Sequence, residues 1–100
     1  MAGRDTKDKN ASDAQSAVEK AVLSTVGVSR LIERQPITTG VLITNLFGKV
    51  EIEIYVNVVY GCNIPEVSWN IQERVKDALS ENSTLEPSHI NIHIEGVDLQ

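Results

Sequence analysis

The side chains best suited to chemistry in this sequence are its single cysteine, its two histidines, a set of glutamates and its single tryptophan. Cys62 comes just before a predicted helix, where the helix dipole and the unpaired N–H groups favour a thiolate. A nucleophilic cysteine also needs a general base, and the only histidines, His89 and His93, are distant in sequence. We therefore interpret Cys62 as a small, partly buried side chain in a turn.

The two histidines are four residues apart in a segment whose alternation is typical of a β-strand. On a strand they would share a face but be separated by roughly 13 Å, at about 3.3 Å per residue. One metal ion cannot bind both, because each ligand nitrogen must lie about 2 Å from the metal. No loop has the ligand spacing of a calcium site. We therefore predict exposed strand histidines, with no metal and no cofactor.

The glutamates Glu51, Glu53 and Glu95 are predicted to lie on one face of a sheet. Paired carboxylates can perform acid–base catalysis when burial raises the pKa of one of them. Here they alternate with apolar residues, which is the pattern of a sheet with one solvated face. The sequence also lacks phosphate-binding glycine motifs and GxSxG. We predict no catalytic residue and a protein that is not an enzyme.

The tryptophan has the character of an interaction site. At about 100° per residue of helix, Trp69 lies about 200° from Val67 and falls on the polar side of its helix. Gln72, Glu73 and Lys76 lie on the same side. Because large exposed aromatic side chains are typical of interfaces, we predict that these four residues form an interaction surface. The alternative is that Trp69 folds over the helix edge or packs against the first helix.

The helix that carries the tryptophan is the best-defined element. Asn63 is its predicted N-cap, Pro65 lies in the first turn, and Glu66 completes an Asn-x-x-Glu capping box. The helix is predicted to run to about Leu79. Its apolar stripe, which must lie on a sheet, contains Ile64, Val67, Ile71, Val75, Ala78 and Leu79.

Two strands are predicted before this helix, Val41–Leu46 and Val50–Tyr60, and Phe47-Gly48-Lys49 connects them as a hairpin. A final strand of about six residues is predicted over Ile90–Glu95 and ends at Gly96. In the long strand, the even-numbered residues predict one buried face. The other face is expected to be solvated or to meet a partner, and it carries Glu51, Glu53, Asn57, His93 and Glu95.

The N-terminal part begins with residues 1–11, which are almost entirely polar and are predicted to form a disordered tail. The domain is predicted to span residues 12–100. Ser12 and Gln15 form a second capping box that predicts a helix over Asp13–Ser24. A short strand is predicted over Val26–Glu33, followed by a loop over Arg34–Thr39. The order α-β-β-β-α-β predicts one small α+β domain, with a mixed sheet and helices packed on one face.

Composition excludes several classes of function. The net charge of −5 argues against broad binding to nucleic acid or anionic lipid, because both require a basic surface. A single cysteine cannot form an internal disulfide. No apolar run approaches the roughly 20 residues of a membrane span, and no signal peptide is evident. We expect a cytoplasmic protein with no direct membrane insertion and no nucleic-acid partner; the alternative is binding of a small ligand or a single-stranded nucleic acid through the sheet face.

The second half of the sequence resembles the alkaline-shock protein family, the envelope-stress-response proteins of Gram-positive and related bacteria. The long strand ends in Tyr60-Gly61, Ile64-Pro65-Glu66-Val67 opens the helix, and Ile71-Gln72 and Val75 lie at its centre. The closing strand is similar in Ile90-Asn91-Ile92, Ile94 and Gly96-Val97. The resemblance extends from about Ala14 to Asp98.

This resemblance implies a small, non-enzymatic, cytoplasmic protein that self-associates. Some members of the family lie beneath the membrane through a membrane-anchored relative, and the family is linked to envelope homeostasis and to alkaline or general stress. The resemblance implies no catalytic residues. We therefore expect a protein–protein interaction module that binds itself, a membrane-anchored protein of the same family, or both. An exposed sheet edge or the Trp69 face would make the contact.

Overall fold

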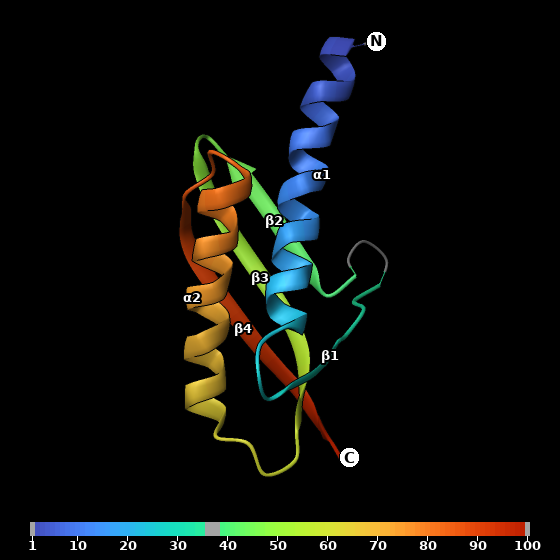
Figure 1. Ribbon diagram of the computed structural model, residues 1–100, viewed down its shortest axis with the longest axis vertical. Helices are drawn as coiled ribbons and strands as arrows, with labels where there is room; N and C mark the ends of the chain where they lie inside the picture. The colour runs from blue at the N-terminus through green and yellow to red at the C-terminus, as the bar shows by residue number, and fades with distance from the viewer. Residues whose placement is uncertain (1, 36–38, 100) are drawn as a thin grey trace.

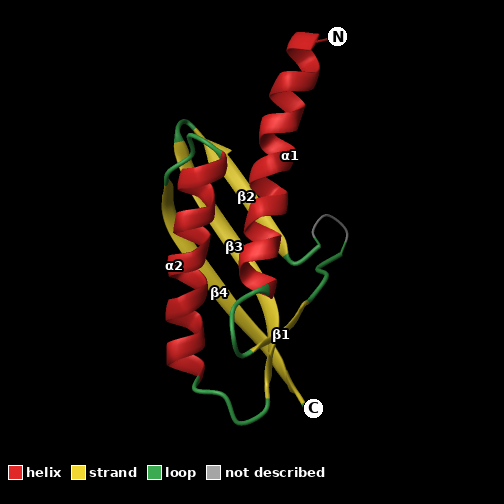
Figure 2. Cartoon of the chain, in the orientation of Figure 1, coloured by secondary structure: helices red, strands yellow, loops and turns green. Residues whose placement is uncertain are grey.

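Two helices cover one face of a four-stranded sheet in the computed structural model, which describes residues 2–35 and 39–99 (Figure 1). The helices are α1 (Ala2–Leu23) and α2 (Ile64–Asn82). Both lie on the same side of the sheet (Figure 2). The strands are β1 (Val28–Leu31), β2 (Val41–Leu46), β3 (Lys49–Val59) and β4 (Pro87–Asp98). The predicted α+β class and the order α-β-β-β-α-β are confirmed.

The sheet is built around β3. β4 pairs with it in parallel from Val50 to Val59, whereas β2 and β1 pair with it antiparallel. β2 covers the first part of β3 up to Ile54, and β1 covers Val56–Val58. Because a strand has only two edges, β1 and β2 lie end to end along one edge and β4 occupies the other. The sheet is therefore mixed, as predicted.

The core lies between β3 and the two helices. The predicted buried face of β3 is confirmed from Val50 to Val58, but Tyr60 is 70% exposed because the chain leaves the sheet at Val59. In the predicted stripe of α2, Ile64 is 41% exposed because it is the first helical residue. The fully buried members of the helices are Ala14, Val18, Val22, Val67, Ile71, Val75 and Leu79.

The start of α2 follows the predicted cap. The Asn63 side-chain oxygen accepts a hydrogen bond from the backbone N–H of Glu66 at 3.1 Å, which satisfies one of the N–H groups that the first turn leaves unpaired. The helix extends beyond the predicted end at Leu79 to Asn82, whose side chain donates to the carbonyl oxygen of Ala78.

Several other predicted boundaries are wrong. The final strand begins at Pro87 rather than Ile90, and the first strand covers only Val28–Leu31 of the predicted Val26–Glu33. α1 begins at Ala2 rather than Asp13, so Ser12 lies inside the helix and is not its N-cap. The final strand does not end at Gly96: the register shifts between Ile94 and Gly96, and pairing then continues to Asp98. The hairpin connection is the two-residue turn Phe47-Gly48, since Lys49 already pairs with Leu46. The tail 1–11 and the domain 12–100 remain predictions, and positions 36–38 of the predicted loop lie outside the described residues.

Candidate interaction surface

The four residues predicted to form an interaction surface lie on the side of α2 away from α1. Trp69 is 60% exposed. Lys76 Nζ lies 3.6 Å from Glu73 Oε2, and both side chains are about half exposed. The α2 residues that border α1 are instead Ala78, Glu81 and Asn82. Trp69 does not line the groove between α1 and α2, and its role in an interaction stays a prediction.

Gln72 connects this side of α2 to β4. Its Nε2 donates to the backbone oxygen of Ile90 at 3.4 Å. Next to this contact, a shallow hollow of about 240 Å³ is lined by Gln72, Lys76, Pro87, Ser88, His89 and Ile90. The predicted surface on α2 is thus continuous with β4, and we call the two together the α2–β4 flank: Trp69, Gln72, Glu73, Lys76 and the outer edge of Pro87–Asp98.

β4 is an edge strand. Among the described residues it pairs with β3 and with no other strand. An open edge presents unpaired backbone groups and is a template for pairing with another chain, and proteins commonly protect such edges with lysines. Pro87–Asp98 contains neither lysine nor arginine. The strand therefore has a long free edge without lysine or arginine.

The other exposed part of the sheet is the face opposite the helices, where the polar side chains bind one another. His93 stacks on Tyr55 with ring centroids 4.5 Å apart, and the Arg34 guanidinium lies 5.1 Å from the Tyr55 ring. Arg34 Nη1 also lies 2.7 Å from Glu95 Oε1. Glu53 lies 2.6 Å from both Asn91 Nδ2 and His93 Nε2. Of the predicted glutamates, Glu53 and Glu95 therefore act as hydrogen-bond acceptors within this network.

A second polar cluster lies where β1 and β4 reach the end of β3. The Asp98 carboxylate accepts hydrogen bonds from Ser29, Arg30 and the amide of Asn57 at 2.7–3.0 Å. Asn57, predicted to lie on the solvated face, is buried. The bonds from Arg30 and Ser29 hold the pKa of Asp98 below its ordinary value of 3.8. The cluster joins the last residue of β4 to the opposite edge of the sheet.

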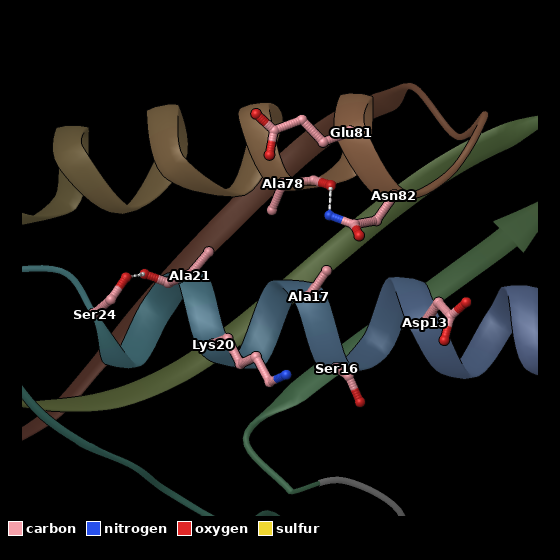
Figure 3. Close-up of a pocket in the computed structure, with 9 residues that line it drawn as sticks. All are labelled: Asp13, Ser16, Ala17, Lys20, Ala21, Ser24, Ala78, Glu81 and Asn82. Carbon is pink, nitrogen blue, oxygen red and sulfur yellow. Dashed lines mark hydrogen bonds between the residues drawn. The ribbon is translucent and has the colours of Figure 1, made fainter.

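A groove of about 410 Å³ lies between α1 and α2 (Figure 3). It is lined by Asp13, Ser16, Ala17, Lys20, Ala21, Ser24, Ala78, Glu81 and Asn82. The Asn82 amide and the Ser24 hydroxyl turn back to carbonyl oxygens of their own helices, at Ala78 and Ala21. The alanines let the two helices approach closely, so we interpret the groove as a consequence of helix packing.

The residues considered for nucleophilic or metal chemistry are not brought together. Cys62 is partly buried in a hollow with Val26, Gly27, Asn63, Glu66, Val67 and Asn70, which includes no histidine. His89 and His93 pair with Glu51 and Tyr55 in the register of β4. Within the described residues, no three His, Cys, Asp or Glu side chains lie close enough to hold a metal ion.

A family model matches residues 9–99 of this chain, which is nearly its whole length. The model is that of the alkaline-shock protein 23 family, described by a cell envelope-related function. The chain belongs to the alkaline-shock protein 23 family. The resemblance seen in the sequence is thereby confirmed.

Curated relatives of this family member come from Gram-positive bacteria, and all are named as uncharacterized. Spy1535 of Streptococcus pyogenes serotype M6 is 44% identical over 50% of this chain and 39% of its own length. YloU of Bacillus subtilis is 28% identical over 71% of this chain and 59% of its own. Spy1614 of the same Streptococcus strain is 30% identical over 67% of this chain and 55% of its own length. The chain thus spans less than two thirds of these relatives, and no solved structure matches it.

Because of the network around Glu53, the stability of this family member is expected to depend on pH in the acid range. Burial tends to raise the pKa of Glu53, but hydrogen bonds from Asn91 and His93 outweigh it, so the pKa lies below the ordinary value of 4.5. A carboxylate with a lowered pKa stabilises the fold above its unfolded pKa and loses this contribution as pH falls through the folded pKa. The stabilisation from Glu53 is therefore expected to be present above about pH 4.5 and lost below it.

We expect Glu53→Gln to lower the free energy of unfolding near neutral pH, and its difference from the wild type to shrink as pH falls from about 5 to about 3. Urea unfolding at a series of pH values measures this. Glu51→Gln is the control, since it removes a carboxylate from the same face whose side chain has no hydrogen bond to the described residues. If the difference in free energy of unfolding between Glu53→Gln and the wild type stayed constant with pH, the lowered pKa of Glu53 would be contradicted.

Proposed function

We propose that this chain is a non-enzymatic protein–protein interaction module that serves the cell envelope-related function of its family. The α2–β4 flank is the proposed contact surface. The observation that carries the proposal is the coincidence of two features on one side of the molecule. Trp69 is exposed on the helix whose Gln72 contacts β4, and the free edge of β4 contains neither lysine nor arginine.

These two features supply different parts of a binding energy. Backbone pairing along an edge strand contributes affinity with little dependence on sequence. A tryptophan that becomes buried on binding contributes a large apolar area and is the residue type most often found to dominate interface energies. Gln72 already bonds to the backbone of Ile90. The helix and the strand therefore present one fixed surface.

The proposed partners are a further copy of this chain, a membrane-anchored protein of the same family, or both. Within residues 2–35 and 39–99, no helix is long and apolar enough to cross a membrane. We propose a cytoplasmic location with attachment to the membrane through such a partner. The link to envelope homeostasis and to alkaline or general stress is part of this proposal.

Binding of a small ligand or a single-stranded nucleic acid through the open sheet face has less support. That face carries one aromatic side chain on β3, Tyr55, and His93 and Arg34 already contact its ring. The Arg34 and Arg30 side chains are paired with Glu95 and Asp98. Stacking of bases and pairing with phosphates would require these contacts to break.

Trp69→Ala tests the proposed surface. We expect association to weaken by about tenfold or more, because removing a central interface aromatic typically costs about 2 kcal/mol or more and a tenfold change is about 1.4 kcal/mol. Sedimentation velocity measures self-association, and a tagged chain expressed in its native cells measures recovery of other proteins. Circular dichroism confirms that the variant is folded.

Tyr60→Ala is the matched control, because Tyr60 is a 70% exposed aromatic residue in the turn that follows β3. The proposal predicts that this variant associates as the wild type does. Equal association by wild type, Trp69→Ala and Tyr60→Ala would show that the α2–β4 flank is not the contact surface.

A further inference from the structure

β4 has a side-chain pattern that is nearly symmetric about Ile92. Ile90 and Ile94 flank the centre, and His89 and Glu95 lie one position further out on each side. If β4 pairs antiparallel with a second β4 centred on Ile92, Ile90 lies opposite Ile94 and His89 opposite Glu95. Directly opposite residues share a face, so the isoleucines meet on the helix side and the imidazole meets the carboxylate on the open side. Two-fold symmetry produces each of these contacts twice.

Neighbouring registers lose this match. A shift that centres the pairing on Asn91 places His89 opposite His93, and one that centres it on His93 places Asn91 opposite Glu95. Neither places an imidazole opposite a carboxylate. A shift that brings isoleucines opposite polar residues would direct the apolar side chains of one copy to the solvated face of the other. The register centred on Ile92 is therefore the one that the sequence of β4 favours.

The surroundings of β4 also suit a second negatively charged copy. The acidic residues of the strand, Glu95 and Asp98, are already paired with Arg34 and Arg30, which reduces repulsion between two chains that each carry a net charge of −5. Of the other outer strands of the sheet, β1 has 4 residues and β2 has only 6. Gln15 of α1 donates to the backbone oxygen of Val41 at the start of β2. β4, with 12 residues, offers the longer edge.

The tryptophan falls near the centre of this arrangement. α2 and β4 run in opposite directions (Figure 1), and the contact between Gln72 and Ile90 aligns them. From Gln72 back to Trp69 the helix rises about 4.5 Å, at about 1.5 Å per residue. From Ile90 to Ile92 the strand advances about 6.6 Å in the same direction, at about 3.3 Å per residue. Trp69 thus lies near the level of Ile92, on the side of α2 away from α1.

We propose that the α2–β4 flank binds a second copy of this chain, with the two β4 strands antiparallel and Ile92 on the two-fold axis. The two sheets then form one continuous sheet, and the Trp69 side chains of both copies cover the junction on the helix side. This inference rests on the proposed function and specifies its partner and register.

A symmetric disulfide tests the position of the axis. In a chain with Cys62→Ser, the substitution Ile92→Cys places two thiols opposite each other, within the Cα separation that a disulfide requires. We expect mild oxidation to convert most of this variant into a covalent dimer. Thr44→Cys in the same background places a thiol on β2, and that variant is expected to remain a monomer on denaturing gels.

A charge exchange tests the register. His89→Glu sets like charges opposite each other at two symmetric sites, and we expect it to raise the dimer dissociation constant by about tenfold, which is about 1.4 kcal/mol. The double variant His89→Glu with Glu95→His restores the pairing of imidazole with carboxylate and is expected to recover most of the affinity. Sedimentation equilibrium measures all three proteins. A double variant that is no tighter than the single one would overturn the register.

The outcomes separate this inference from the proposed function. A dimer that depends on Trp69 but does not cross-link through Ile92→Cys would overturn the edge pairing and leave the interaction surface in place. A wild-type chain that stays monomeric at high concentration would overturn the self-partner. In that case, Trp69-dependent recovery of a different protein from cells would still support the proposed function, and its absence would count against both.

Discussion

Ile71→Ala is expected to lower the free energy of unfolding by about 2–5 kcal/mol. Ile71 is 0% exposed and lies in the middle of the buried stripe of α2, between Val67 and Val75. Truncation removes apolar contacts and leaves a cavity between the helix and the sheet that the surrounding strands cannot fully close. Small domains have a total stability of about 5–15 kcal/mol, so the loss is a large fraction. Urea unfolding followed by circular dichroism measures it.

Ile64→Ala provides the comparison in the same helix with the same change of side chain. Ile64 is 41% exposed at the first residue of α2, so its truncation is expected to cost less than about 1 kcal/mol. If the two variants lost equal stability, Ile71 would not occupy the core position that the structure gives it.

Gly27→Ala is expected to lower the free energy of unfolding by about 2–4 kcal/mol. Gly27 has φ +99°, which L-residues rarely adopt, and an added Cβ would lie only 2.4 Å from Val67 Cγ2. Both the backbone strain and the overlap with α2 contribute to the cost. Gly27 therefore sets how closely the turn after α1 packs against the start of α2. Chemical unfolding of the purified variant measures the effect.

Two further variants separate these causes. Gly61→Ala has a similar φ of +88° but no atom within 4 Å of the added Cβ, so it reports the backbone cost alone, about 1–2 kcal/mol. Val67→Ala removes the atom that Gly27→Ala would meet, so the double variant is expected to lose less than the sum of the two single losses. Strict additivity would contradict a direct contact between Gly27 and Val67.

The elements with strong periodicity could be predicted from the sequence. The capped start of α2 at Asn63 and the alternation of β3 are local signals, and each specifies which face is buried. The start of α1 could not be predicted, because its first residues are polar and carry no apolar stripe. The continuation of β4 past Gly96 depends on a register shift against β3, which no property of residues 87–98 alone reveals.

Only part of the candidate surface could be predicted from the sequence. Helical geometry places Trp69 on the polar side of α2, and the structure shows it exposed. That this side adjoins the free edge of β4 follows from the packing of α2 on the sheet, as the contact between Gln72 and Ile90 shows. The network of Arg34, Tyr55, His93 and Glu53 was likewise missed, because it joins residues from three separate segments.

Amide hydrogen exchange of β4 at low and high protein concentration tests the central claim most directly. If the free edge of β4 is a contact surface for a second copy, the amides of residues 90–94 become more protected as concentration rises, while those of β2 remain unchanged. Exchange in β4 that is independent of concentration, in a sample that sedimentation shows to be associated, would place the contact elsewhere on the molecule.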